Sequence, residues 1–140
     1  MLEPARAEAI LRRIRRVPIF ETLRMRVDEM DEGVCRGTVP YDRKYDGIFA
    51  SFHGGLLMTI ADSFACFAVM TRTGPDEAMT TTDMNIRFLA PCRSDVTAEA
   101  RVIKLGRTLC PLSVDLFDAG GVLVAVAQVT YMRLGSRTGG

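Results

Sequence analysis

Apolar residues recur with two different periods along the chain, and these periods divide it into expected helices and strands. Within residues 1–18, apolar side chains repeat every three or four positions with arginines between them, which predicts an amphipathic N-terminal helix. Pro4 is suited to the first turn of this helix. Pro18 lacks the backbone N–H that a continuing helix needs, so we expect the helix to end there.

A longer run, from Gly54 to Thr71, is apolar on nearly all helical faces, which predicts a helix surrounded by protein. Gly74 and Pro75 follow it as stop signals. The run is long enough to span a membrane. It contains Asp62, however, and a charged group at bilayer depth is costly. We therefore expect the core helix of a soluble protein, with no membrane partner.

Elsewhere apolar and polar residues alternate with a period of two, which is typical of half-buried strands. Clusters of Gly, Pro, Asp and Ser separate these segments and predict turns. The order favours an α+β fold, in which a six-stranded antiparallel sheet wraps around the long helix. Residues 135–140 are expected to form a flexible tail. The expected strands cover residues 22–30, 33–40, 79–89, 94–105, 108–117 and 122–134.

The composition indicates a single domain over residues 1–140. Apolar residues make up 48% of the chain, and the formal net charge of +1 gives no global attraction for nucleic acid. The four cysteines form no CxxC pair, and a single histidine cannot complete a usual zinc set. We therefore expect reduced thiols in a cytoplasmic protein, and no metal site.

Asp62 is the residue that most needs an explanation. An ionised carboxylate among apolar groups costs several kcal/mol unless it is paired. No lysine or arginine lies within one helical turn of it, and Thr59 offers only a hydroxyl. One interpretation is that Asp62 faces a polar groove or a distant arginine. The other is that it is a base or nucleophile whose environment tunes its reactivity.

Gly54 and Gly55 favour the functional interpretation. They stand at the expected start of the helix, where backbone N–H groups lack internal partners and the helix dipole adds positive charge. Such a position suits a carbonyl oxygen that becomes negative during attack, although a plain tight turn would also explain the glycines. Gly54 and Asp62 are eight residues apart, about 12 Å along a helix. One carbonyl group can meet both only if they come from two antiparallel helices, as in a two-fold dimer.

The ordered set of motifs resembles the PaaI-like acyl-CoA thioesterases of the hotdog-fold superfamily. "HGGLLMTIADS" is similar to the His-Gly-Gly motif and the helix with the catalytic acid, and "NIRFLAP" and "ARVIKLGR" are similar to later strands. The resemblance implies hydrolysis of an acyl-CoA by a dimer or tetramer, with no cofactor beyond the CoA of the substrate. It implies that Asp62 activates water or attacks directly and that the Gly54 N–H polarises the carbonyl. It also implies that His53 shapes the loop and that Thr81 helps to hold the water.

The resemblance further implies a substrate-binding set. "KLGRTL" lies where the family often binds CoA phosphates, although a hairpin with solvated basic residues explains it equally well. Many relatives carry asparagine six residues before the motif histidine, whereas this chain has Gly47, which puts orientation of the carbonyl in doubt. The candidate substrate-binding residues are Gly47, Gly55, Phe88, Lys104, Gly106, Arg107 and Thr108.

Two other functions compete with thioester hydrolysis. A hotdog protein can bind acyl-CoA without catalysis, as a metabolite sensor, because a fold does not fix a function. The presence of both Asp62 and the glycine pair favours the enzyme. A hotdog hydratase fits less well, because those enzymes generally pair a catalytic histidine with an acid across the site, and the one histidine here directly precedes the glycines.

Overall fold

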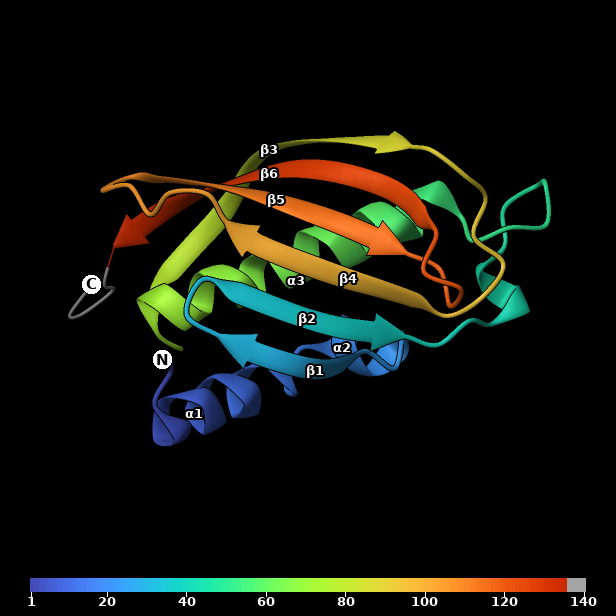
Figure 1. The fold of residues 1–140 in the computed structure, drawn as a ribbon. Coiled ribbons are helices and arrows are strands. Elements are labelled where there is room, and N and C mark those ends of the chain that lie inside the picture. Colours follow the sequence, from blue (N-terminus) through green and yellow to red (C-terminus); the bar gives the residue numbers. More distant parts are fainter. Residues whose placement is uncertain (136–140) are drawn as a thin grey trace.

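The computed structural model of the chain describes residues 1–135. Two short helices come first, and a six-stranded sheet then surrounds a third, much longer helix (Figure 1). The expected tail, residues 135–140, lies outside the described residues except for Gly135. The elements in chain order are α1 (Pro4–Ile14), α2 (Pro18–Thr22), β1 (Arg26–Asp31), β2 (Val34–Val39), η1 (Arg43–Tyr45), α3 (Gly54–Thr73), β3 (Ala78–Phe88), β4 (Val96–Val102), β5 (Leu109–Phe117) and β6 (Leu123–Gly135).

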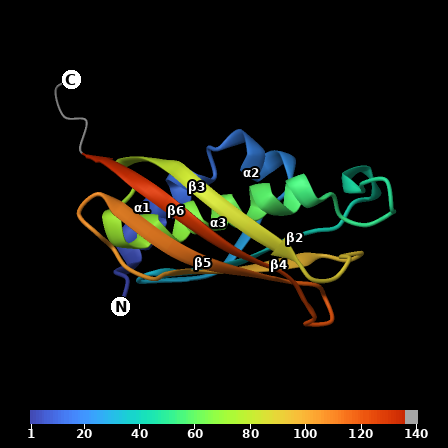
Figure 2. The ribbon, with the colours of Figure 1, turned by 90° about the horizontal axis from the view of Figure 1, so that it is seen from above.

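The sheet confirms the expected architecture. Its six strands follow the order β1-β2-β4-β5-β6-β3, and every neighbouring pair is antiparallel. The sheet curves around α3, while α1 and α2 lie along the side of α3 that the sheet leaves open (Figures 1 and 2). Among the described residues, β3 pairs only with β6 and β1 pairs only with β2, so these two strands form the edges of the sheet.

α3 forms the core, as its all-round apolar pattern predicted. The helix is long and apolar enough to cross a membrane, with a mean hydropathy of 1.5 over an 18-residue stretch, but 56% of that stretch is buried inside the fold. The ring of Phe64 is fully buried where the helix meets β2. A Cβ at Gly37 would overlap this ring and the carbonyl oxygen of Arg26, so glycine is what allows the helix and the sheet to approach closely here.

The N-terminal region corrects two expectations. α1 already ends at Ile14, and Pro18 begins α2 instead of only ending a helix. The fixed φ of proline is compatible with the first helical position, which explains the second role. Residues 22–25 were expected to be strand, but α2 includes Thr22 and Arg24 has a φ of 54°, so β1 begins only at Arg26.

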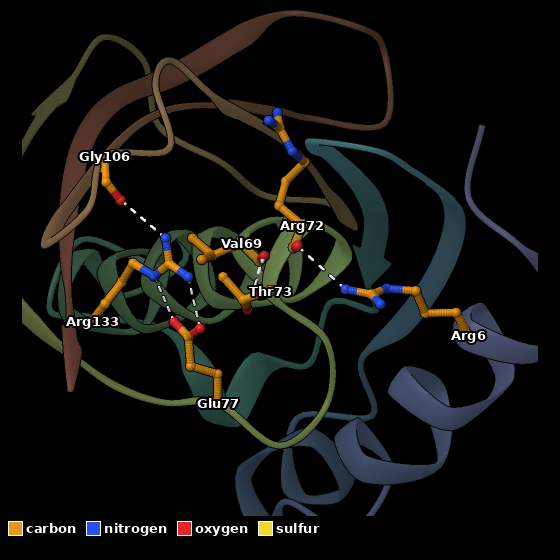
Figure 3. Close-up of polar contacts among 7 residues, drawn as sticks. All are labelled: Arg6, Val69, Arg72, Thr73, Glu77, Gly106 and Arg133. Atoms are coloured by element: carbon orange, nitrogen blue, oxygen red, sulfur yellow. Dashed lines mark hydrogen bonds and ion pairs between the residues drawn. The ribbon is translucent and has the colours of Figure 1, made fainter. Parts of the chain in front are cut away.

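The C-terminal end of α3 is fixed by polar contacts (Figure 3). Arg133 on β6 donates from Nε and Nη2 to the two carboxylate oxygens of Glu77, each at 2.7 Å. Its Nη1 donates to the carbonyl oxygen of Gly106 at 3.1 Å. Arg133 therefore ties the loop between β4 and β5 to the segment that links α3 to β3. Arg6 of α1 also donates to the carbonyl oxygen of Arg72, at 3.3 Å.

Candidate active site

Two hydroxyl groups hold the Asp62 carboxylate. Thr81 Oγ1 and the Tyr131 hydroxyl each donate to Asp62 Oδ1 at 2.8 Å, and the Tyr131 hydroxyl also lies 3.0 Å from the Asp62 carbonyl oxygen. Thr81 on β3 and Tyr131 on β6 are direct cross-strand partners, so the sheet presents both hydroxyls to the same point on α3. Thr59 does not take part, because its hydroxyl donates to the carbonyl oxygen of Gly55.

No arginine or lysine among residues 1–135 forms an ion pair with Asp62. The interpretation in which a distant arginine neutralises Asp62 is therefore wrong for the single chain. The carboxylate is half-buried, and hydrogen bonds to Oδ1 are its compensation within the described residues. These donors leave Oδ2 without a hydrogen-bond partner in the same part of the chain, so Oδ2 is available to water or a substrate.

Tyr131 is a site residue that the sequence reasoning missed. Burial, the neighbouring Cys66 and the Asp62 carboxylate raise the pKa of Tyr131 well above its ordinary value of 10.0. The phenol therefore keeps its proton at physiological pH and acts as a hydrogen-bond donor. The one available signal for Tyr131 was its place in the apolar–polar alternation of the last expected strand. A tyrosine that is buried there usually finds a hydrogen-bond partner for its hydroxyl.

Cys66 lies one helical turn beyond Asp62. Burial raises the pKa of its thiol to about 11, so the group is neutral at physiological pH. A neutral thiol is a poor nucleophile, so Asp62 is the better candidate for a reactive group at this position. All four cysteines fall within the described residues and are free thiols.

The His-Gly-Gly segment forms the N-terminus of α3. His53 is the N-cap: its Nδ1 accepts a hydrogen bond from the Gly55 N–H at 2.9 Å, and its own N–H donates to the Tyr45 carbonyl oxygen at 2.8 Å. His53 therefore orders the helix start, and Nδ1 is already occupied. The Gly54 N–H, in contrast, has no hydrogen-bond acceptor among residues 1–135.

Phe88 and Gly47 lie close to this helix start. A Cβ at Gly54 would lie 3.1 Å from the Phe88 ring, so the end of β3 covers the glycine closely. Gly54, Leu57 and Phe88 line a pocket of about 380 Å³. Gly47 donates its N–H to the Ser51 carbonyl oxygen at 2.8 Å, and a Cβ there would lie 3.6 Å from His53 Cδ2. Gly47 thus forms part of the loop that supports the histidine.

The proposed CoA-binding loop, residues 104–108, lies elsewhere, at the end of α3 that Arg133 fixes. Lys104 and Arg107 are exposed there. The Gly106 N–H is not free for a phosphate group, because it donates to the Leu109 carbonyl oxygen at 3.0 Å. The Thr108 carbonyl oxygen accepts from the Arg133 N–H at 2.7 Å. The basic side chains, not the glycine amide, are the free groups of this loop.

One chain therefore carries three separate parts of the expected site: the carboxylate with its hydroxyls, the glycine-rich helix start, and the basic loop. An antiparallel sheet wrapped around a single long helix, with a carboxylate midway along that helix, defines a protein of the hotdog fold with a candidate hydrolytic centre. A family model described as the thioesterase superfamily matches residues 49–125, more than half of the chain. The chain belongs to the thioesterase superfamily, and at the level of the family it is a thioester hydrolase.

Individual relatives agree with this membership. Human acyl-coenzyme A thioesterase 13 is 32% identical over 94 residues, which make up 64% of this chain and 65% of the relative. A thioesterase family protein from Silicibacter pomeroyi superposes with a TM-score of 0.87 at 26% identity, over 93% of this chain and 98% of that chain. The E. coli PaaI protein superposes with a TM-score of 0.88 at 21% identity, over 97% and 98% of the two chains.

A further structural neighbour, described as a hypothetical thioesterase from Streptococcus pneumoniae, was solved with coenzyme A. It has a TM-score of 0.74 at 22% identity and covers 81% of this chain and 88% of its own. At this level of identity, it and PaaI establish the shared fold.

Proposed function

We propose that the protein hydrolyses acyl-CoA thioesters to a free carboxylic acid and CoA. The observation that carries the proposal is the Asp62 carboxylate, which two hydroxyls hold through Oδ1 while Oδ2 stays unpaired within the described residues. The acyl-coenzyme A activity in the name of the human relative and the CoA in the S. pneumoniae neighbour support the choice of thioester.

Asp62 Oδ2 is the reacting atom of the proposed mechanism. As a general base, it takes a proton from a water molecule whose oxygen bonds to the carbonyl carbon of the thioester. The carbon–sulfur bond then breaks, and CoA leaves as a thiol after the proton reaches its sulfur. As a nucleophile, Oδ2 instead bonds to the carbonyl carbon and expels CoA, and water then hydrolyses the acyl-aspartyl anhydride. Both routes give the same products.

The Gly54 N–H stabilises the carbonyl oxygen as it becomes negative. Within one chain, this amide and Asp62 are about 12 Å apart along the helix, too far to act on one carbonyl group. A two-fold dimer removes this conflict by bringing the helix start of one protomer to Asp62 of the other. The outer edge of β3, which pairs with no other strand among residues 1–135, is a suitable contact for the second copy, since a long open strand edge readily pairs with another strand.

Exposed cations hold the CoA part of the substrate in this proposal. Lys104 and Arg107 form no ion pair within residues 1–135, so both are available for phosphate groups. Arg133 does not bind phosphate in this proposal. It fixes the loop that carries Lys104 and Arg107, because it donates to the Glu77 carboxylate and to the Gly106 carbonyl oxygen. Phe88, Gly47 and Gly55 then border the helix start that receives the carbonyl group.

The first test replaces the reacting group. We expect Asp62→Asn to lower kcat by about 10²–10⁴-fold, the usual contribution of a general base, while the protein stays folded. Hydrolysis of a panel of acyl-CoA thioesters, followed by release of free thiol, measures this. Full activity of the Asp62→Asn protein, with deamidation excluded by mass spectrometry, would contradict the assignment. Thermal stabilisation of the wild type by acyl-CoA without any turnover would instead identify a binding protein.

The second test removes one backbone donor. Gly54 is the first helical residue, where proline is tolerated, so Gly54→Pro deletes the N–H and keeps the helix. We expect a loss of about 10²–10³-fold in kcat, the typical effect of losing one oxyanion donor. Gly54→Ala is the matched control, because it adds the same Cβ near Phe88 but retains the N–H. Equal losses in both variants would show that crowding, and not the amide, is responsible.

A further inference from the structure

The loop between β4 and β5, residues 103–108, has few backbone hydrogen bonds of its own. The ladder between the two strands ends at Val102. The next N–H, of Ile103, donates to the Pro111 carbonyl oxygen at 2.9 Å, but proline has no N–H to return the bond. Gly106 supplies the one further backbone bond that closes the loop in the described part of the chain. The loop therefore depends on contacts from outside to keep one shape.

Arg133 on β6 supplies two of these outside contacts. Its backbone N–H donates to the Thr108 carbonyl oxygen at 2.7 Å, and its Nη1 donates to the Gly106 carbonyl oxygen at 3.1 Å. Gly106 and Thr108 are the two chain neighbours of Arg107. A single residue of the last strand thus fixes the backbone on both sides of Arg107.

Glu77 keeps the Arg133 guanidinium in this position. It accepts from Nε and Nη2, which leaves Nη1 directed at the loop (Figure 3). The Arg133 and Glu77 side chains are 25% and 18% exposed, so salt screens this ion pair less than one on an open surface. Hydrogen bonding to Arg133 lowers the pKa of Glu77, and the carboxylate is therefore ionised at physiological pH.

The charges at this end of the molecule divide into two kinds. The positive charge of Arg133 is compensated by Glu77. Lys104 and Arg107 form no ion pair within residues 1–135, so their charges are free for an anion. Arg133 is therefore suited to hold the loop, and the two exposed cations are suited to bind.

We propose that Arg133 is a positioning residue for CoA recognition: oriented by Glu77, it holds Arg107 and the loop around it in the arrangement that receives phosphate groups. The inference rests on the proposed function. A loop that is already ordered loses less conformational entropy when it binds, so this contact improves the affinity for CoA. The effect is confined to substrates with phosphate groups, because the Arg133 side chain contacts neither Asp62 nor the start of α3.

Arg133→Met tests this role with two matched substrates. A CoA thioester carries the phosphate groups, and the N-acetylcysteamine thioester of the same acid lacks them; the acyl group is benzoyl or hexanoyl, whichever wild type hydrolyses faster. We expect Arg133→Met to raise the Kd for free CoA and the KM for the CoA thioester by about tenfold, as for one lost charge-assisted hydrogen bond. The kcat for the CoA thioester, and kcat/KM for the N-acetylcysteamine thioester, should stay unchanged. Titration calorimetry gives the Kd, and steady-state kinetics give the other values.

Arg6→Met is the matched control. It removes the same positive charge near the same end of α3, where Arg6 donates to the Arg72 carbonyl oxygen, but it breaks no bond to the loop (Figure 3). It should change neither the Kd for CoA nor either set of kinetic constants. A rise in the Kd for CoA equal to that of Arg133→Met would show that overall charge is responsible, and would overturn the positioning role.

Arg133→Lys separates position from charge, and it keeps the test decisive if the methionine variant does not fold. Lysine retains the positive charge but lacks the planar fork that binds Glu77 and the loop together. We expect the affinity for CoA to fall as it does in Arg133→Met. Wild-type affinity in Arg133→Lys would show that the charge itself attracts phosphate, which contradicts the positioning role.

The last comparison is Arg107→Ala, alone and combined with Arg133→Met. If Arg133 acts through Arg107, the double variant should weaken CoA binding by much less than the product of the two single effects, because coupled residues are not additive. Independent effects, or an equal loss with the N-acetylcysteamine thioester, would overturn the positioning role and leave thioester hydrolysis standing. CoA affinities that follow the expected order without hydrolysis of any thioester would support the positioning role and reject the proposed enzyme.

Discussion

At the scale of single residues, the main result is how the fold accommodates Asp62. The chain supplies no counter-charge within residues 1–135 but two hydroxyl donors to one carboxylate oxygen. The sequence identified Asp62, His53 and Gly54 because they lie in one short stretch with fixed spacing. It could not identify Tyr131, because the contact joins residues 69 positions apart and depends on how β6 pairs with β3.

Tyr131 is expected to position Asp62. Tyr131→Phe removes one donor to Oδ1 and should lower kcat by about 10- to 100-fold, since a hydrogen bond to a charged group contributes about 1.5–3 kcal/mol. KM should be unchanged, because the hydroxyl holds the carboxylate and does not bind CoA. Steady-state kinetics separate the two parameters. Tyr45→Phe is the control, because that hydroxyl bonds to the Thr22 carbonyl oxygen. A rise in KM with an unaltered kcat would contradict the positioning role.

At the scale of elements, most helices and strands were predictable and their junctions were not. Strict alternation identified the sheet, and all-round apolarity identified α3. The start of β1 was missed because Pro18 has two opposite meanings: it cannot continue one helix, yet it readily begins another. The contact between Glu77 and Arg133 was also hidden, because it depends on the strand register that brings the two segments together.

The Glu77–Arg133 pair makes a pH-dependent contribution to stability. Hydrogen bonding to Arg133 holds the pKa of Glu77 below its ordinary value of 4.5, so the folded state binds this proton more weakly than the unfolded state. The stabilisation is present above that value and is lost as the pH falls through the lowered pKa. Glu77→Gln should therefore cost about 1 kcal/mol at neutral pH.

Urea unfolding of the wild type and Glu77→Gln at several pH values measures this contribution. The difference in unfolding free energy should shrink towards zero as Glu77 becomes protonated at acidic pH. A difference that stays constant from neutral to acidic pH would show that packing, not charge, makes Glu77 important.

At the scale of the whole molecule, the single chain looks incomplete in two respects. The two groups of the proposed mechanism, the Asp62 carboxylate and the Gly54 amide, belong to the same helix and lie about 12 Å apart along it. Ile48 and Phe49, at the tip of the loop before α3, are 91% and 83% exposed, which is costly for large apolar side chains in water. A two-fold partner would both cover such surface and complete each site.

Mixing two inactive variants tests whether the site is shared. If Asp62 and the Gly54 amide come from different protomers, a dimer of one Asp62→Asn chain and one Gly54→Pro chain retains one intact site of two. Random re-association should then restore about a quarter of wild-type activity, since half of the dimers are mixed. The mixture is prepared by co-refolding and compared with each variant alone. No recovery in a mixture shown by native mass spectrometry to contain mixed dimers would place both groups within one protomer.

The sequence alone determined most of the elements, the fold and the candidate acid, because periodicity, glycine pairs and a lone carboxylate in an apolar run are local patterns. The tertiary structure decided what surrounds that acid, two hydroxyls from neighbouring strands, and how Arg133 holds the loop between β4 and β5. These neighbours are set by strand register. Such contacts between distant segments leave no local pattern in the chain.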